Sequence, residues 1–456
     1  MHENFDLDLL LELVEQKKLR QLREILQEMN EVDIASFLDE LEPEQLIVVF
    51  RLLPKELAAE VFAYMEDSDS QQRLISTLSD RELREVLNEL YVDDAVDIIE
   101  DMPANLVTRI LRNTDPSTRH QINQLLNYPK DSAGSIMTTE YVFLHPDDTV
   151  AESFARIRKV GLDKETVYTC YVTKNRVLQG VVTVRQLLLN DYETKVADIM
   201  ETNVLSVNTH DDKEDAAQLL SRYDFTALPV VDGENRLVGI ITVDDAMDVM
   251  EEEATEDFEK MAAILPSDKP YLKTGVFETA RARLPWLMLL MLSATFAGII
   301  LAGFESTLAL IPALTAFIPM LTGTGGNSGA QSSVAVIRAL SLGEVESRDW
   351  WGVIWKELRV SVLCGIALGV VNFGKMLLVD NLLLGNPEVS AMVSLVVCLT
   401  LTVTVICAKV VGCLLPMAAE KIGLDPAVMA SPFITTVVDV LSLLIYFWIA
   451  IQLLGL

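Results

Sequence analysis

Residues 281–456 are dominated by long runs without a charged side chain, and this feature constrains the fold most strongly. The uncharged runs cover residues 284–304, 306–337, 360–374 and 389–408. Residues 426–456 contain a single charge, Asp439. A helix that crosses a bilayer needs about 20 mainly apolar residues. We therefore predict five membrane spans, near residues 284–304, 309–340, 353–379, 389–416 and 427–454.

The charge of the chain lies in its other part. The chain has 36 Lys and Arg and 67 Asp and Glu; 9 and 10 of these lie in residues 281–456, which leaves 27 and 57 in residues 1–280. The first part thus has a net charge of −30 and the second a net charge of −1. We expect no nucleic-acid partner, because a phosphate backbone selects basic surfaces. The acidic surface either attracts cations or serves only to keep this part in solution.

The charges of the loops predict the orientation of the spans, because Lys and Arg accumulate in cytoplasmic loops. One side of the predicted spans has a single basic residue, Lys375. The other side has ten: Lys269, Lys273, Arg281, Arg283, Arg338, Arg348, Lys356, Arg359, Lys409 and Lys421. The first residues of the chain are acidic, unlike those of a signal peptide. We expect a multi-pass protein of the cell (inner) membrane, with a cytoplasmic N-terminus and an extracytoplasmic C-terminus.

Several other protein classes are not expected. Four of the five Cys lie in apolar stretches and only Cys170 lies in the acidic part, which argues against a disulfide-stapled secreted protein. The four His form no pair at the four-residue spacing of a zinc-protease helix. The sequence contains neither a nucleophile–base pair nor a phosphate-binding loop that follows a strand, so we predict that the protein is not an enzyme.

One carboxylate lies within the last predicted span, in the sequence PFITTVVD at residues 432–439. Thr435, Thr436 and Asp439 fall on one helical face. An Asp near the centre of a spanning helix costs about 2.5–3.5 kcal/mol on insertion scales, and it usually faces a bundle interior or a water-filled path. We therefore predict that these residues line an ion path, with Asp439 as the metal ligand. The alternative is a buried Asp that is hydrogen-bonded to a neighbouring helix.

The second predicted span contains the Gly-rich sequence PMLTGTGGNSGAQSS at residues 319–333. Asn327 and Gln331 are four residues apart and should project together, so we include them among the pore-lining candidates. Polar, Gly-rich backbone at membrane depth is tolerated only where protein buries it or water fills a cavity. The alternative is close packing of helices through small residues. Hydroxyl, amide and carboxylate oxygens suit a hard cation such as hydrated Mg²⁺.

Residues 1–131 indicate an all-α superhelical domain. Pro residues at positions 43, 54, 103 and 116 separate short segments with apolar residues at helical spacing, which is typical of stacked small helices. From about residue 133, two units resemble each other. They begin with SIMT at residue 135 and DIME at residue 198, and their β-rich runs end in GVVT at 180–183 and GIIT at 239–242.

These two units resemble a tandem CBS-domain pair of α+β fold, with the first domain at residues 132–196 and the second at 197–250. LPVVD at 228–232 and LVGIITVDD at 237–245 carry the resemblance. CBS pairs are regulatory, and many bind adenine nucleotides, so the resemblance makes ATP a candidate cofactor. The nucleotide motif Gly-x-x-Thr-x-x-Asp is complete at Gly239, Thr242 and Asp245, whereas the first unit has Gln186 in place of the Asp.

An amphipathic helix at residues 244–268 should connect the two parts of the chain. Its predicted apolar stripe contains Met247, Met250, Ala254, Phe258, Met261 and Leu265. The opposite stripe is acidic, and Lys260 is the only basic residue between Asp244 and Pro266. Unpaired like charges destabilise a helix by tenths of a kcal/mol each. The acidic stripe is therefore either a solvated face or a surface that cations neutralise.

Taken together, the chain resembles the MgtE family of magnesium channels and transporters. The most specific motifs are GGNSGAQ at 325–331, IRA at 337–339, DPA at 425–427 and PFITTVVD at 432–439. The resemblance implies a multidomain fold: the helical N domain, the CBS pair, the connecting "plug" helix and an all-α five-helix transmembrane domain at residues 284–454. It also implies a homodimer in the bilayer, with Asp439 of each subunit holding hydrated Mg²⁺ in a pore at the subunit interface.

The resemblance further implies cytosolic Mg²⁺ sites between the N domain, the CBS pair and the plug helix. The residues at the motif positions are Asp93, Asp97, Asp224, Asp245, Asp248, Glu253, Glu256 and Asp257. Facing acidic surfaces repel one another and should close when divalent ions bind between them. We expect a Mg²⁺ importer that cytosolic Mg²⁺ inhibits. The alternative is a regulated transporter of another divalent cation in which the CBS pair senses nucleotide.

Overall fold

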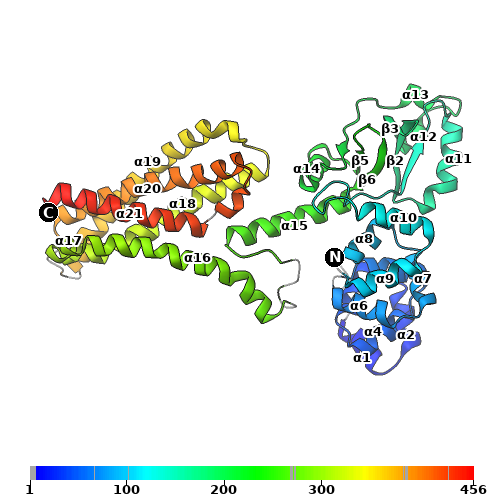
Figure 1. Cartoon of the computed structure of the whole chain (residues 1–456), viewed down its shortest axis with the longest axis horizontal. Coiled ribbons are helices and arrows are strands. Elements are labelled where there is room, and N and C mark those ends of the chain that lie inside the picture. The colour runs from blue at the N-terminus through cyan, green and yellow to red at the C-terminus, as the bar shows by residue number, and fades with distance from the viewer. Residues whose placement is uncertain are drawn as a thin grey trace. The chain divides into compact units, whose positions relative to one another are not determined.

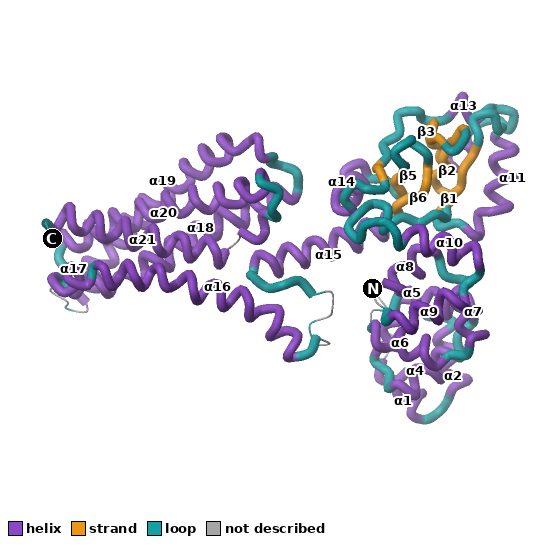
Figure 2. The backbone as a smooth tube through the Cα atoms, viewed as in Figure 1, coloured by secondary structure: helices purple, strands orange, loops and turns teal. Residues whose placement is uncertain are grey.

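The computed structural model of the chain describes residues 7–65, 67–100, 102–267, 271, 274–383, 385, 389–429 and 431–455. It contains two compact units, Met1–Met250 and Glu251–Leu456. Strands occur only in the first unit among these residues, between helices α10 and α15, and the described part of the second unit is helical (Figures 1 and 2). This division follows the charge distribution of the sequence.

The first unit begins with short stacked helices. They are α1 (Leu7–Glu15), α2 (Leu19–Leu26), α3 (Glu31–Asp39), α4 (Pro43–Phe50), α5 (Lys55–Ala63), α6 (Ser68–Thr77), α7 (Asp80–Leu87), α8 (Val92–Glu100), α9 (Ala104–Asn113) and α10 (Pro116–Leu125). Pro43 and Pro116 are the first residues of their helices, while Pro54 and Pro103 immediately precede α5 and α9. Pro is favoured at the first position of a helix because its φ is already helical. It has no backbone N–H, and an N–H in the first turn would have no partner within the helix anyway.

Two three-stranded sheets follow, each with a parallel and an antiparallel pair. The first sheet contains β1 (Tyr141–Leu144), β2 (Thr166–Lys174) and β3 (Val177–Thr183), with α11 (Val150–Val160), η1 (Gly161–Asp163), α12 (Val184–Leu189) and α13 (Val196–Ile199) around it. The second contains β4 (Val207–Asn208), β5 (Ala227–Val231) and β6 (Leu237–Thr242), with α14 (Lys213–Tyr223). The repeated order of elements confirms the predicted α+β pair.

The connecting helix α15 spans Val243–Met261, so it is shorter than the predicted 244–268, whose last residue lies outside the described residues. Its buried residues are Ala246 and Val249, which join the core of the first unit. The predicted apolar stripe is not one continuous packing face in the single chain: Met261 packs against Ile337 and Ala427, but other large members are exposed. Met247 and Phe258, which belong to that stripe, are 65% and 71% exposed. Ala246 and Val249 pack into the core of the first unit, whereas Met247 and Phe258 have no cover in the single chain.

The described part of the second unit is a bundle of long helices joined by short ones. They are α16 (Val276–Gly303), α17 (Glu305–Leu310), η2 (Pro312–Phe317), α18 (Ile318–Ser341), η3 (Ser347–Asp349), α19 (Trp350–Lys375), η4 (Met376–Leu383), α20 (Ala391–Lys421), η5 (Pro426–Met429) and α21 (Ser431–Leu454). Among the described residues, four helical stretches are long and apolar enough to cross a membrane: Val276–Gly303, Ser347–Asn381, Ala391–Lys421 and Pro426–Leu454. The remaining predicted span, 309–340, corresponds to η2 and α18, whose Gly, Ser and Thr residues lower its hydropathy.

Helix α18 is continuous through its Gly-rich sequence and packs between α20 and α21. A Cβ atom at Gly325 would lie 2.7 Å from Thr404 Cγ2, and one at Gly329 would lie 2.8 Å from Ile434 Cγ2. From the other side, a Cβ at Gly412 would lie 2.3 Å from the backbone oxygen of Gly329. These glycines therefore allow close contact of helices, which is the small-residue packing weighed above, rather than a break in the helix.

Candidate functional site: an acidic cluster and a polar membrane region

Strand pairing brings two glutamates together in the first sheet. Tyr141 begins β1 and pairs in parallel register with Thr166, the first residue of β2. Glu140 and Glu165 immediately precede these two residues, and the backbone N–H of Glu165 donates to the carbonyl oxygen of Glu140 at 3.0 Å. Parallel neighbours start at the same edge of a sheet, so both side chains lie at that edge.

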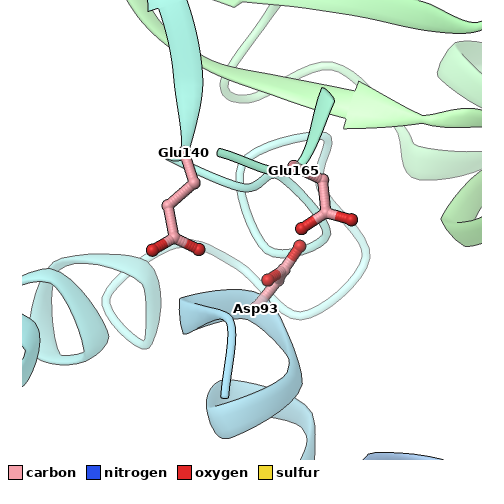
Figure 3. A group of neighbouring side chains, drawn as sticks. All are labelled: Asp93, Glu140 and Glu165. Atoms are coloured by element: carbon pink, nitrogen blue, oxygen red, sulfur yellow. The ribbon is translucent and has the colours of Figure 1, made fainter. Parts of the chain in front are cut away.

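Helix α8 supplies a third carboxylate. Asp93 lies in its first turn, and Glu140 Oε2 accepts a hydrogen bond from the backbone N–H of Val92 at 3.2 Å. The positive end of a helix favours carboxylates at this position. The carboxylate oxygens of Asp93, Glu140 and Glu165 come within 4.8 Å of one another, and Figure 3 shows the three side chains converging from α8 and from the starts of two strands. We call these three residues the acidic cluster.

Two of the three carboxylates of the acidic cluster have a buried oxygen whose negative charge no hydrogen bond stabilises among the described residues. Asp93 is 8% exposed, and within the described residues neither its Oδ1 nor the Oε2 of Glu165 has a hydrogen-bond partner. Burial, followed by the negative charge of Asp245, raises the pKa of Asp93 well above its usual range. Burial and the same neighbouring charge raise the pKa of Glu165 to about 8. Glu165 therefore retains a proton near neutral pH unless a cation compensates its charge, and the pKa of Asp93 is shifted in the same direction.

Two neighbouring aspartates, Asp245 and Asp94, also have raised pKa values. Burial raises the pKa of Asp245 to about 7, although a hydrogen bond from Thr242 opposes the shift. Burial and the charge of Asp244 raise the pKa of Asp94 to about 6. The charged neighbours that shift the pKa values of these four groups are all carboxylates, and none of them is a basic residue. An oxygen-only donor set of this kind is suited to Mg²⁺ or Ca²⁺ rather than to a soft metal.

The acidic cluster contains one of the residues expected from the sequence, Asp93, and lies beside a second, Asp245. Glu140 and Glu165 were missed because only the parallel pairing of two strands far apart in sequence brings them together. The available signal was their shared position, one residue before each β-like run of the first CBS unit.

The other predicted cytosolic residues lie outside the acidic cluster. Asp97, Asp224 and Asp248 are exposed in the first unit. Asp224 ends α14 in a left-handed conformation with a φ of 53°. The remaining predicted residues lie on the part of α15 that belongs to the second unit: Glu253, Glu256 and Asp257. There, burial and then the charge of Asp425 raise the pKa of Asp257.

The predicted nucleotide motif has a structural role in the fold. The Thr242 hydroxyl donates to Asp245 Oδ2 at 2.6 Å where β6 passes into α15. A Cβ at Gly239 would lie 2.7 Å from the backbone oxygen of Thr138, so the strand needs Gly there for close approach. The first unit forms the equivalent cap with Thr183 and Gln186. The motif is therefore explained by capping and packing even without a nucleotide.

The membrane residues divide between two faces of α18. Asn327 and Gln331 line a pocket of about 400 Å³ together with Thr324, Ser328, Cys364, Ala367, Leu368 and Lys409. On the opposite face, Thr435 contacts α18 at Gly326. Asp439 is half-buried on α21 and does not line this pocket. The single chain thus brings Asn327 and Gln331 together, as predicted, but on another side of α18 from Thr435.

Lys409 is an unpredicted member of the pocket. Its ammonium is buried and donates to Ser332 Oγ at 3.3 Å, and the Ser332 hydroxyl donates to Glu357 Oε2 at 2.6 Å. A fixed ammonium beside Asn327 and Gln331 disfavours a second cation in the same pocket.

The predicted pore-lining residue Thr436 does not line this pocket. Its Oγ1 donates to the backbone oxygen of Pro432 at 3.2 Å, a bond within its own helix.

Models of known protein families match most of the chain. A divalent cation transporter model, MgtE, matches residues 318–449, and a model of the MgtE intracellular N domain matches residues 29–131. The CBS domain model matches twice, at residues 133–192 and 196–252. The same order of domains follows from the helices, the two sheets and the membrane bundle described above.

Individual relatives agree with these matches. The magnesium transporter MgtE of Thermus thermophilus is 40% identical over 97% of both chains, and that of Bacillus subtilis is 35% identical over 92% of this chain and 93% of its own. A crystal structure of the cytosolic domain of the Mg²⁺ channel MgtE in complex with ATP is 41% identical, with a TM-score of 0.50, over 53% of this chain and 98% of that one. The soluble part of a magnesium transporter is 31% identical with a TM-score of 0.51, over 54% and 98%. The chain is therefore a multi-pass membrane transporter, not an enzyme, and it belongs to the MgtE family of magnesium transporters.

Proposed function

We propose that the protein imports Mg²⁺ across the cell membrane and that Mg²⁺ bound to its cytosolic part inhibits this import. The observation that carries the regulatory half is the acidic cluster, in which three carboxylates converge within 4.8 Å and two of their oxygens have no hydrogen-bond partner among the described residues. The identity of the ion is supported by the relatives, which are magnesium transporters.

The acidic cluster is a sensor because its charge costs free energy until a cation binds. Two ionised carboxylates 4.8 Å apart would repel by about 3.5 kcal/mol at an effective dielectric constant near 20, and the raised pKa values reflect this cost together with burial. A divalent ion replaces this repulsion with attraction, so it favours whichever conformation holds the carboxylates together. A ligand shifts a conformational equilibrium by its difference in affinity for the two states. High cytosolic Mg²⁺ therefore favours the compact, closed state.

The transport half of the proposal assigns Asp439 to the ion path. Its carboxylate lies half-buried on α21, a helix long and apolar enough to cross a membrane. An intramembrane carboxylate without a structural reason to be there usually lines a substrate path. Mg²⁺ keeps most of its water, so one carboxylate from each subunit of a homodimer, with Thr435 and Thr436 nearby in the sequence, is a sufficient ligand set.

Nucleotide binding by the CBS pair is a second candidate function. A specific observation favours it: the cytosolic domain of the 41% identical relative was crystallised with ATP. Gly239, Thr242 and Asp245 are the proposed contacts. Their role in capping α15 means that nucleotide binding here would act directly on the start of the connecting helix. Transport of another divalent cation remains the alternative substrate assignment.

The test is tracer Mg²⁺ influx into proteoliposomes, with low or high Mg²⁺ on the side of the first unit. Asp439→Asn should abolish influx under both conditions. Asp93→Asn should leave influx at low Mg²⁺ intact and raise the inhibitory Mg²⁺ concentration about tenfold, the effect of about 1.4 kcal/mol of lost binding energy. Asp33→Asn, at an exposed position on α3, is the matched control. Unchanged inhibition in Asp93→Asn would exclude the acidic cluster as the sensor, and influx that survives Asp439→Asn would move the path elsewhere.

A further inference from the structure

The only basic residue of α15 lies among carboxylates of the second unit. The Lys260 ammonium is 2.6 Å from Asp425 Oδ2 and also pairs with Glu256, one turn earlier on the same helix. Asp425 immediately precedes η5 and lies just before α21, the helix that carries Asp439. The contact therefore joins the end of the connecting helix to the start of the helix that we assign to the ion path.

Further contacts fix the same end of α15. Met261 packs against Ile337 and Ala427. The Asp257 carboxylate accepts a hydrogen bond from Ser341, at the end of α18. Lys260 is thus the charged centre of a docked helix end and not an isolated surface pair.

The charge balance at this contact depends on Lys260. Asp257 and Glu256 on α15 face Asp425, so three carboxylates surround a single ammonium. Burial lowers the pKa of Lys260, but hydrogen bonds and attraction from Asp425 and Glu256 outweigh it and raise the pKa above its ordinary value. The ammonium is therefore held charged, and it bridges two carboxylates as a bound metal cation would. Without it, α15 and Asp425 would repel each other.

We propose that Lys260 is a tethered cation that holds the end of α15 against Asp425 in the absence of Mg²⁺ and competes with divalent cations for Glu256 and Asp425. This inference rests on the proposed Mg²⁺-inhibited transport. Lys260 is a positioning residue: it sets how far the closed state is populated before any metal binds. Because it occupies carboxylates that a divalent ion could use, it also limits how steeply inhibition responds to Mg²⁺.

The test compares variants that keep or remove the charge of Lys260. Lys260→Gln should raise influx at nominally zero Mg²⁺ several-fold, up to about tenfold for the loss of one charge-assisted hydrogen-bonded pair. The same variant should make inhibition by Mg²⁺ steeper, because Glu256 and Asp425 become available to the ion. Lys260→Arg should restore most of the wild-type behaviour. Lys159→Gln, at an exposed position on α11, is the control for a lost surface lysine.

A double-mutant cycle shows whether the effect passes through Asp425. In an Asp425→Asn background, Lys260→Gln should add no further change, and exchange of the two charges (Lys260→Glu with Asp425→Lys) should recover low basal influx. The proposal is overturned if Lys260→Gln has wild-type basal influx, or if its effect is equally large in the Asp425→Asn background. The charge exchange keeps the test decisive if a single variant folds poorly.

A second measurement does not depend on transport. Met261→Cys and Ala427→Cys place two thiols at the docked end, and the rate of their cross-linking by a short bifunctional reagent in EDTA reports docking directly. Adding Lys260→Gln should slow cross-linking several-fold, and added Mg²⁺ should restore it. An unchanged rate overturns the tethered-cation proposal. If wild-type influx proves insensitive to Mg²⁺ while cross-linking still depends on Lys260, the proposed regulation fails and the role of Lys260 in docking stands.

Discussion

Replacing Glu165 by Gln should stabilise the metal-free protein, although it removes a residue of the proposed metal site. Glu165 lies among carboxylates, its Oε2 lacks a hydrogen-bond partner among the described residues, and burial raises its pKa to about 8. Gln has nearly the same shape but no charge, and its amide can donate to the carboxylates of Asp93 and Glu140. The substitution removes repulsion while keeping the packing.

The size of the effect follows from the pKa. At pH 7.5, holding a proton on a group with an unfolded pKa of 4.5 costs about 4 kcal/mol, at 1.36 kcal/mol per unit. Glu165 is only partly buried, and solvent screening reduces this to about 2 kcal/mol. For a unit of 150–250 residues, 1 kcal/mol corresponds to about 2–4 °C in melting temperature. We therefore expect Glu165→Gln to raise the melting temperature of the first unit in EDTA by about 4–8 °C.

The pH dependence gives the sign of the effect. The folded state binds the extra proton, so the destabilisation by Glu165 is absent below the unfolded pKa of 4.5, grows as the pH rises, and levels off above about 8. The gain from Glu165→Gln should therefore nearly vanish at pH 5. Saturating Mg²⁺ should make the wild type the more stable of the two proteins, because the wild type can bind the ion through Glu165 and the variant cannot. Differential scanning calorimetry of the purified full chain at pH 5 and 7.5, with EDTA or Mg²⁺, measures all four conditions.

Glu193→Gln is the matched control, since Glu193 is exposed and its replacement changes the net charge equally. It should shift the melting temperature by less than about 1 °C, as surface substitutions usually do. The reasoning is refuted if Glu165→Gln fails to stabilise the protein in EDTA at pH 7.5. It is equally refuted if the stabilisation is as large at pH 5, because the effect would then not come from ionisation.

Three further predictions concern metal binding and packing. Mg²⁺ binding near pH 7 should release about one proton or more per chain, because the carboxylates with raised pKa must lose protons to bind it, and calorimetric titration in buffers of different ionisation enthalpy measures the number. Gly412→Ala, which places a methyl group 2.3 Å from the α18 backbone, should destabilise the membrane unit by about 1–3 kcal/mol in thermal unfolding, whereas Gly374→Ala, with open space around it, should not. Arg109 donates to three backbone carbonyls at the end of α6 and to the carboxylate of Asp80, so Arg109→Ala should lower the stability of the helical domain by about 2 kcal/mol in chemical unfolding, while the exposed Arg20→Ala should change it little.

Local features of the sequence determined the order and type of the domains. Hydropathy over about 20 residues identifies a spanning helix by itself, because the bilayer imposes its thickness on each segment separately. Four predicted spans correspond to the helical stretches found, and the Pro positions of the N domain do mark helix starts. The CBS pair followed from a repeated pattern of short motifs. The excess of acidic residues was compatible with a cation-binding surface or with a merely solvated one, and it did not indicate which carboxylates lie together.

Tertiary structure alone decided which residues meet. Glu140 and Glu165 lie together because β1 and β2 pair in parallel, and Asp93 joins them through the position of α8. The glycines of α18 serve close helix packing, which depends on Thr404 and Ile434 on other helices. Likewise, Lys260 looks like a single charge on an acidic helix until Asp425 is placed beside it. Periodicity is a property of neighbours along the chain, whereas the energies of burial and of charge pairs depend on neighbours in space, and these are set only when the chain folds.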